Sequence, residues 1–468
     1  MLDLIVFGMV VLLMLGLSFR GAERGETFLF ADRAVGFFPL VATLVMTEFN
    51  TATLLAFSAV GYLVGPRAVG LSAVFLIGLA WYTFAVARKW KQYDGASVAG
   101  WFSQRYGVGL GRFAAVMLLM AMLGFSAAYV KSLTLIINPL LGGMNAWVLS
   151  AVLCAVLAAV TSSGGLRSVV RLDIMGFVLT CLLLPMLLVI GWYRNDGTVA
   201  WQSHFQGDPL TMEYWTRWQD PQLPWSFVLS LVVLTCMTYI CSPWYGQKIF
   251  AARSERVAVT AVGLASLIVF VLYASVQIAA SLLPSDVASL SDPQLAVPTM
   301  LDLWLPGGLR GLAYAVLFAV ATTTLAGVWS AMVAMLVNDF GRQWSDDVGV
   351  QRGLTALLAI GSWLGANLLV DDILNRLLLA NIPIAALSFA LLGGFHWKQA
   401  SRIGAWTSMI VGLAWGVFCF AYWGDAGGYT WYWAIYGVPI IFGTGVAVSL
   451  LAPDRIQENL KVTIINAT

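Results

Sequence analysis

The sequence contains few charged residues. Only 10% of its 468 residues are Asp, Glu, Lys or Arg, while 60% are hydrophobic; soluble domains have about 25% and about 45–50%. A soluble globule of this composition would aggregate, because it would expose large apolar patches. The net charge is only +2, and no run of Lys and Arg could contact a phosphate backbone. We therefore expect no nucleic-acid partner.

Histidine and cysteine are also scarce. His204 and His396 are far apart, and the five cysteines occur singly, without a Cys-x-x-Cys spacing. This pattern excludes the usual zinc and redox motifs. The sequence has no nucleophile motif either. We therefore expect no enzyme, no catalytic residue, no cofactor and no metal other than a transported ion.

Apolar runs of about 20 residues dominate the chain, and each is long enough to cross the ~30 Å hydrocarbon core of a bilayer. Their number makes the bilayer the expected environment. The predicted fold class is an all-α integral membrane protein with about 13 transmembrane helices. The predicted spans are 3–19, 38–63, 68–88, 110–138, 144–163, 172–193, 225–246, 255–282, 308–337, 351–370, 373–394, 402–422 and 429–451.

The placement of Lys and Arg predicts the orientation of these spans. Of the 25 basic residues, 19 fall in segments on one side, five on the other, and Lys131 within a span. Cytoplasmic segments carry the excess of positive charge. We therefore expect a multi-pass protein of the cell (inner) membrane with its N-terminus outside and its C-terminus in the cytoplasm. The two long outer segments, 194–224 and 283–307, are expected to form ordered caps with short interfacial helices.

A polar patch interrupts the second span. Residues 46–53 read Met-Thr-Glu-Phe-Asn-Thr-Ala-Thr between apolar stretches. Unwinding here would free backbone carbonyls, which are suitable ligands for an alkali cation. The alternative is that these side chains only bond neighbouring helices, as Thr and Asn often do in membranes. For Glu48, a costly carboxylate in a span, a functional role is the better interpretation.

The seventh span contains a comparable interruption. Residues 235–246 include Pro243, which removes a helical donor, and Gly246, which loosens the backbone. Spans 2 and 7 each begin a group of five, and the odd count gives the two groups opposite orientations. Matching interruptions in two inverted halves indicate the binding site of a transporter.

Three further polar positions lie within or beside spans. Thr322, Thr323 and Thr324 are consecutive in span 9, although such hydroxyls often bond only to their own helix. Asp173 begins span 6 and is either functional or paired with Arg167 or Arg171 at the cytoplasmic surface. Lys131 either snorkels to the interface or pairs with a carboxylate.

Four segments occur in a characteristic order along nearly the whole chain. Segment 94–107 ends in Arg-Tyr-Gly, 164–173 runs from Gly-Gly-Leu to Asp, 247–253 reads Gln-Lys-Ile-Phe-Ala-Ala-Arg, and 325–339 ends in Asn-Asp. Each segment is a weak signal alone, but their order and spacing are specific. Together they resemble the sodium:solute symporter family, which includes proline and pantothenate permeases, sialic acid transporters and sodium–glucose cotransporters.

The resemblance implies a LeuT-type fold with a five-plus-five inverted repeat. The expected segments are an N-terminal helix and loop (1–37), a first repeat (38–193), an outer loop (194–224), a second repeat (225–394), and two C-terminal helices with a short tail (395–468). The resemblance also implies a sodium site between spans 2 and 9. Its five oxygen ligands would be the carbonyls of Met46, Phe49 and Val320 and the hydroxyls of Thr323 and Thr324.

Glu48 and Asp173 are the candidates for a second cation site or for coupling. Leu172 and Gly176 replace the family's usual Thr and Gln, which argues against a second sodium ion. The polar residues that bind sugars in the family are not reproduced, so an amino acid or a carboxylate is expected instead. The expected substrate contacts are Asn50, Thr53, Lys131, Thr235, Thr238, Tyr239 and Trp244.

These observations predict a secondary active transporter that imports a small organic solute together with sodium by alternating access. Its partners would be that solute, sodium and the lipid bilayer. Two alternatives stay open from the sequence. One is proton coupling through Glu48 or Asp173, and the other is a membrane sensor that binds its solute without sustained transport.

Overall fold

The computed structural model describes residues 1–18, 34–95, 97–163, 166–205, 209, 211–216, 223–287, 289–344, 347–425 and 428–454. Within these residues the chain is built from helices and contains no named strand. The Gly164-Gly165 pair and the tail from residue 455 lie outside the described residues, as do the side chains of Arg167 and Arg171.

Each predicted span corresponds to a helix or to a short series of helices. In order, they are α1 (Leu2–Ser18), α3 with α4 (Phe37–Glu48, Thr51–Val64), α5 with η3 and α6 (Val69–Tyr82, Thr83–Ala87, Arg88–Gln92), α8 (Val108–Leu140), α9 (Ala146–Ser163), α10 (Leu166–Arg194), α13 with α14 (Trp225–Tyr239, Pro243–Ala251), α15 (Glu255–Leu282), α17 with η6 (Leu309–Met335, Leu336–Phe340), α18 (Val348–Leu368), α19 with α20 (Ile373–Ala385, Ser388–His396), α21 (Arg402–Trp423), and α22 with η8 and α23 (Tyr429–Trp431, Tyr432–Tyr436, Gly437–Leu451).

Length and composition alone identify fewer spans. Among the described helices, seven are long and apolar enough to cross a membrane, or up to nine if each of two bent pairs is one span. The criterion treats 51–92 as one helical stretch and classes α1, α3 and α9 as shorter apolar helices. The all-helical membrane architecture agrees with the sequence prediction, while individual spans are less regular than the hydropathy suggested.

The stretch 51–92 contains two spans, because the chain reverses within it. The rings of Phe57 and Phe75 are only 5.4 Å apart, whereas 18 residues of straight helix would separate them by roughly 27 Å. The reversal follows Gly65, whose φ of 76° is accessible to glycine at little cost. The short helix η2 (Gly65–Ala68) then leads into α5.

Shorter helices occupy the long connections. The predicted caps contain α11 (Thr198–His204) and α12 (Met212–Thr216) in one segment, and η4 (Leu283–Ser285), η5 (Pro293–Leu295) and α16 (Ala296–Trp304) in the other. This confirms that the caps contain short helices. The sequence analysis did not predict α7 (Val98–Tyr106), η7 (Arg342–Trp344) or the 42° bend between α19 and α20.

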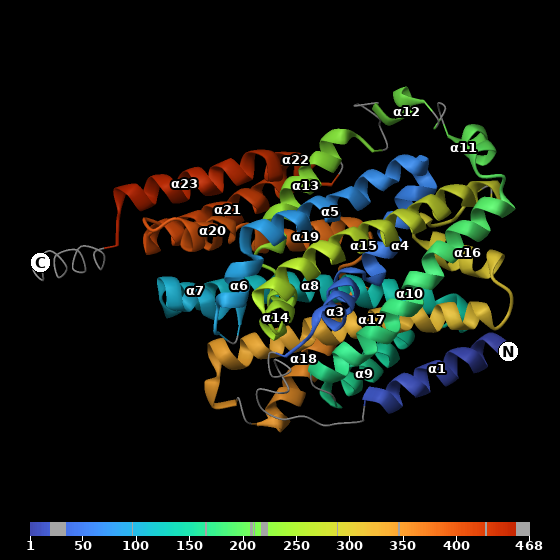
Figure 1. Ribbon diagram of the computed structural model, residues 1–468, viewed down its shortest axis with the longest axis horizontal. Coiled ribbons are helices and arrows are strands. Elements are labelled where there is room, and N and C mark those ends of the chain that lie inside the picture. Colours follow the sequence, from blue (N-terminus) through green and yellow to red (C-terminus); the bar gives the residue numbers. More distant parts are fainter. Residues whose placement is uncertain are drawn as a thin grey trace, which may run out of the picture.

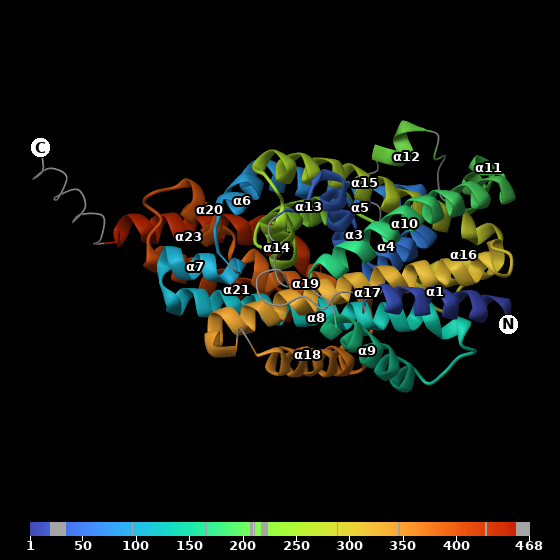
Figure 2. The same ribbon diagram turned by 60° about the horizontal axis from the view of Figure 1, so that its bottom comes forward.

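Helix α17 is the most deeply buried of the long apolar helices, with 94% of its apolar segment inside the protein. Helix α15 packs against α3, α4, α5 and α10. Figures 1 and 2 show α17 running beside α1 and α8. Asp3 fastens α1 to the start of α17, because its carboxylate accepts hydrogen bonds from the amides of Gly308 (2.7 Å) and Gly311 (3.1 Å).

The described chain begins and ends at opposite ends of the bundle. Figure 1 shows the start of α1 at the right, together with α11 and α12, and the end of α23 at the left. The connection between α20 and α21 also lies at the left end. This arrangement agrees with an odd number of spans.

We predict that α12 faces the outside of the cell and that the α20–α21 connection faces the cytoplasm. The test is to replace the five native cysteines and introduce Met212→Cys or Gln399→Cys, both at exposed positions. In intact cells, a membrane-impermeant maleimide should label the first cysteine and react with the second only after permeabilisation. The opposite pattern would reverse the orientation predicted from the positive charges.

Candidate binding site

The second span is broken in the buried interior. Helix α3 ends at Glu48, Phe49 and Asn50 have extended backbone angles, and α4 begins at Thr51. Phe49 is fully buried and Asn50 is 4% exposed. Backbone groups released by a break at this depth must be satisfied by the protein, because the hydrocarbon offers no partner.

Asn50 and Tyr273 form hydrogen bonds with the backbone groups that the break leaves free. The Asn50 side chain accepts a hydrogen bond from the amide of Thr53 (2.8 Å) and donates one to the carbonyl of Glu48 (2.9 Å). The Tyr273 hydroxyl, on α15, donates to the same carbonyl (2.9 Å) and accepts from the amide of Asn50 (3.1 Å). A single phenol therefore bridges the end of one half-helix and the start of the next. The predicted interruption is confirmed, but the sequence analysis missed Tyr273.

The oxygens expected to bind sodium lie where α3 contacts α17. The hydroxyl of Thr324 is 3.2 Å from the carbonyl of Met46 and 2.9 Å from the carbonyl of Val320. The hydroxyl of Thr323 is 3.2 Å from the Val320 carbonyl. Phe49 lies at the end of α3, one turn beyond Met46. The cluster is buried and consists of neutral oxygens, a type of ligand that suits a hard monovalent cation.

Asp173 has a partner other than those considered from the sequence. The ammonium of Lys248, on α14, lies 3.1 Å from its carboxylate, and each side chain is only 2% exposed. The Thr43 hydroxyl donates to the same carboxylate oxygen and accepts a hydrogen bond from Lys248. This buried group joins α3, α10 and α14 one turn before Met46. From the sequence alone, Lys248 counts among the 19 basic residues of the cytoplasmic segments, because it follows the seventh predicted span and hydropathy does not reveal that α14 turns into the protein.

The seventh span is also broken, as predicted. Helices α13 and α14 meet at an angle of 50°, and α14 begins with Pro243. The intervening carbonyl of Ile240 accepts a hydrogen bond from the Trp90 indole (2.9 Å), and the Ser242 hydroxyl donates to the carbonyl of Thr238 (3.0 Å). Tyr239, the last residue of α13, directs its hydroxyl to the Glu48 carboxylate.

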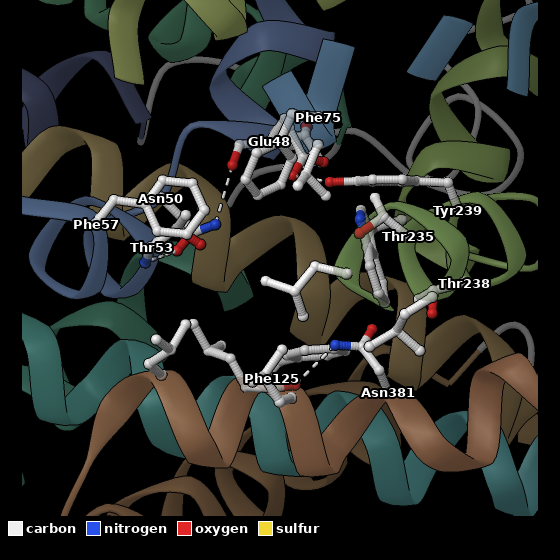
Figure 3. A pocket seen from close by; sticks show the side chains of 18 of the residues that line it. Glu48, Asn50, Thr53, Phe57, Phe75, Phe125, Thr235, Thr238, Tyr239 and Asn381 are labelled. Carbon is white, nitrogen blue, oxygen red and sulfur yellow. Dashed lines mark hydrogen bonds between the residues drawn. The ribbon is translucent and has the colours of Figure 1, made fainter. Parts of the chain in front are cut away.

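A pocket of about 100 Å³ lies between the two breaks. Figure 3 shows Glu48 and Tyr239 on one side of it, with Phe125 and Asn381 across the cavity. The elements that line it are α3 to α5, α8, α13, α14 and α19. The described lining residues are Thr47, Glu48, Asn50, Thr53, Phe57, Val74, Phe75, Phe125, Tyr129, Leu231, Leu234, Thr235, Thr238, Tyr239, Trp244, Leu374, Leu377, Leu378 and Asn381.

Six of the seven expected substrate contacts are in this lining, and the seventh, Lys131, is not. The reason is helical geometry. Phe125 and Tyr129 are four residues apart on α8 and share the face toward the pocket, whereas Lys131 is two residues further and points elsewhere. Asn381 on α19 was not predicted. Its sequence signal is weak, an amide in an apolar span that also contains Asn375.

No protein-family model and no curated protein sequence matches the chain. Solved structures do match. A Na⁺-coupled sialic acid symporter in a substrate-bound, outward-open state superposes with a TM-score of 0.80 at 15% identity, over 97% of this chain and 98% of that one. Mhp1, a nucleobase-cation-symport-1 family transporter, gives 0.56 at 16% identity (92% and 96%). The manganese transporter of Eremococcus coleocola gives 0.53 at 13% identity (89% and 94%).

The chain has a LeuT-type fold. The agreement extends over nearly the entire length of the sialic acid symporter structure, so the expected fold class is confirmed. At these identities the likeness concerns the fold alone.

We predict that Tyr273→Phe destabilises the protein by about 1–3 kcal/mol, mainly the cost of leaving the buried Asn50 amide without a partner, since the Glu48 carbonyl keeps its hydrogen bond from the Asn50 side chain. Both the Glu48 carbonyl and the Asn50 amide lose a hydrogen bond in this variant. Thermal unfolding of the purified protein in detergent measures the effect. Tyr422→Phe, at a position 72% exposed, is the matched control, and equal shifts in the two variants would show that Tyr273 does not stabilise the break.

We also predict strong coupling between Lys248 and Asp173. Lys248→Met leaves a buried carboxylate unpaired and should cost about 3–5 kcal/mol, whereas Lys248→Met with Asp173→Asn should recover most of that loss. A double-mutant cycle of thermal unfolding measures the coupling. Additive effects would mean that the two side chains act independently.

Proposed function

We propose that the protein belongs to the sodium:solute symporter family and imports a small organic solute together with sodium by alternating access. The observation that carries this proposal is the position of the neutral-oxygen cluster of Met46, Val320, Thr323 and Thr324. It lies at the end of the same half-helix, α3, that presents Glu48 to the pocket. A cation and a solute bound at these two places would stabilise the same broken segment.

This shared segment provides a mechanism for coupling. A ligand shifts a conformational equilibrium only through different affinities for the two states. Sodium would fix the end of α3 against α17, while the solute would fix the α3–α4 break against α13 and α8. Each would favour the arrangement that the other requires, so the two would bind cooperatively.

The available energy is sufficient for concentrative uptake. One sodium ion that enters at about 100 mV releases about 2.3 kcal/mol, and each tenfold sodium gradient adds about 1.4 kcal/mol. Together these terms would sustain roughly several-hundred-fold accumulation. We assign one sodium site, since Asp173 already has an internal cation in Lys248.

The lining of the pocket supports only part of the expected substrate range. Nine of its 19 described side chains are pure hydrocarbon, and several of the polar ones already form hydrogen bonds within the protein, which does not favour a sugar. Its described residues include no Lys, Arg or His, which does not favour a simple carboxylate. An amino acid fits better than either.

Proton coupling is the second candidate, and one observation favours it. Glu48 is buried, and the ion pairs of the described residues do not include it. A carboxylate in such a place can act as a proton carrier. Whole-cell uptake of pooled radiolabelled metabolites, with and without sodium and at two pH values, distinguishes the two candidates and identifies the solute.

We predict that Thr324→Ala and Thr323→Ala weaken sodium binding about five- to tenfold, as expected for the loss of one hydroxyl contact. A sodium titration of thermal stability in detergent, with potassium as the reference, measures this without knowledge of the substrate. Thr322→Ala is the matched control, because the Thr322 hydroxyl bonds to the carbonyl of Phe318, which is not among the expected sodium ligands. If all three variants titrate like the wild type, sodium does not bind at this cluster.

A further inference from the structure

Glu48 is the one carboxylate among the described residues of the pocket. It is 5% exposed, and the Tyr239 hydroxyl donates a hydrogen bond to it. A hydrogen bond from a neutral phenol provides no positive charge. The nearest candidate considered from the sequence, Lys131, is absent from the lining. The pocket therefore presents a carboxylate that lacks a counter-ion from the described chain.

The rest of the wall suits a cation with an apolar remainder. Six aromatic side chains line the pocket: Phe57, Phe75, Phe125, Tyr129, Tyr239 and Trp244. The faces of aromatic rings attract ammonium groups, most strongly where water is excluded. An anion would meet repulsion from Glu48 without compensation, and a polyol would face nine side chains that are pure hydrocarbon.

Several polar side chains of the wall already form hydrogen bonds within the protein. The Thr47 hydroxyl donates to the carbonyl of Thr43 (2.6 Å), the Asn381 amide donates to the carbonyl of Leu377 (2.8 Å), and Asn50 caps the helix break. The hydroxyl of Thr238 is different, because it is buried and has no hydrogen-bond partner. A ligand in the pocket would supply that partner.

We propose that the pocket binds the ammonium group of a small amine or amino acid, with Glu48 as its counter-ion and Thr238 as a second polar contact. The aromatic wall covers the apolar remainder. This inference rests on the proposed solute site but not on sodium coupling. The cavity of about 100 Å³ is suited to a small solute.

A matched series of ligands tests the charge of the solute. Isopentylamine, leucine, isopentyl alcohol and 4-methylpentanoate share one apolar skeleton and differ in the polar group, and the corresponding isobutyl and ethyl series extend the test to smaller sizes. Ligand-induced thermal stabilisation of the purified full-length protein, in sodium buffer, gives the apparent affinities. At the best-fitting size, an ammonium compound should bind at least tenfold more tightly than the matched alcohol or carboxylate.

Glu48→Gln keeps the shape of the side chain and removes its charge. The variant should lose at least tenfold in affinity for the ammonium compound and show little preference over the matched alcohol. Glu255→Gln makes the same chemical change at a partly exposed position outside the pocket and should keep the wild-type preference. Thr238→Val removes the unpartnered hydroxyl and should weaken binding severalfold, which gives a second test if Glu48→Gln unfolds.

Three results would overturn the inference: binding of an alcohol or carboxylate in preference to every amine, an unchanged preference in both pocket variants, or no stabilisation by any ammonium compound at millimolar concentration. A preference for ammonium compounds without sodium dependence would support the inference and contradict sodium coupling. Sodium-dependent stabilisation without a preference for ammonium compounds would support sodium coupling and contradict the inference.

Discussion

The break in the second span is the feature on which the rest of the site depends. A helix interrupted in hydrocarbon leaves backbone groups that water cannot reach, so the fold must supply their partners. The Tyr273 hydroxyl and the Asn50 side chain supply these partners to the Glu48 carbonyl, and the Tyr273 hydroxyl also accepts from the Asn50 amide. Because the ends are held in this way, α3 can terminate at Glu48, whose side chain lines the pocket, and the Met46 carbonyl can meet the Thr324 hydroxyl.

The break also determines where the other helices lie. Tyr273 must reach Glu48, which places α15 against both halves of the broken span, and the aromatic rings of Phe49, Phe57 and Phe75 pack around the same phenol. On the other side, Thr324 brings α17 to Met46. Tyr239 joins the second broken helix to the first through Glu48. The pocket therefore forms where the two interrupted helices come together through the hydrogen bond between Tyr239 and Glu48.

Local signals in the sequence predicted much of this arrangement. The polar patch at 46–53 and Pro243 predicted the two breaks, and apolar runs predicted the helices, because both features act through the chain's own backbone. Contacts between side chains on different helices were harder to predict. Lys248 was assigned to the cytoplasmic side because it follows the seventh predicted span. Lys131 was assigned to the substrate site because a charge in a span does not reveal which face of the helix it occupies. Tyr273 sits in an apolar run where nothing local distinguishes it, and its role exists only once α15 packs against the break.

The two buried carboxylates of this region differ in a way that bears on their roles. Asp173 is neutralised by Lys248, a cation that is part of the chain, so it needs no ligand and holds three helices together in the absence of one. Glu48 has a phenol but no cation within the described structure. Charge burial in a membrane interior is costly unless it is compensated. A fixed ion pair stabilises one arrangement, whereas a carboxylate that depends on a mobile cation stabilises the closed pocket only when that cation is present. Such dependence on a ligand is what the proposed alternating-access mechanism would require of Glu48 in the proposed binding site.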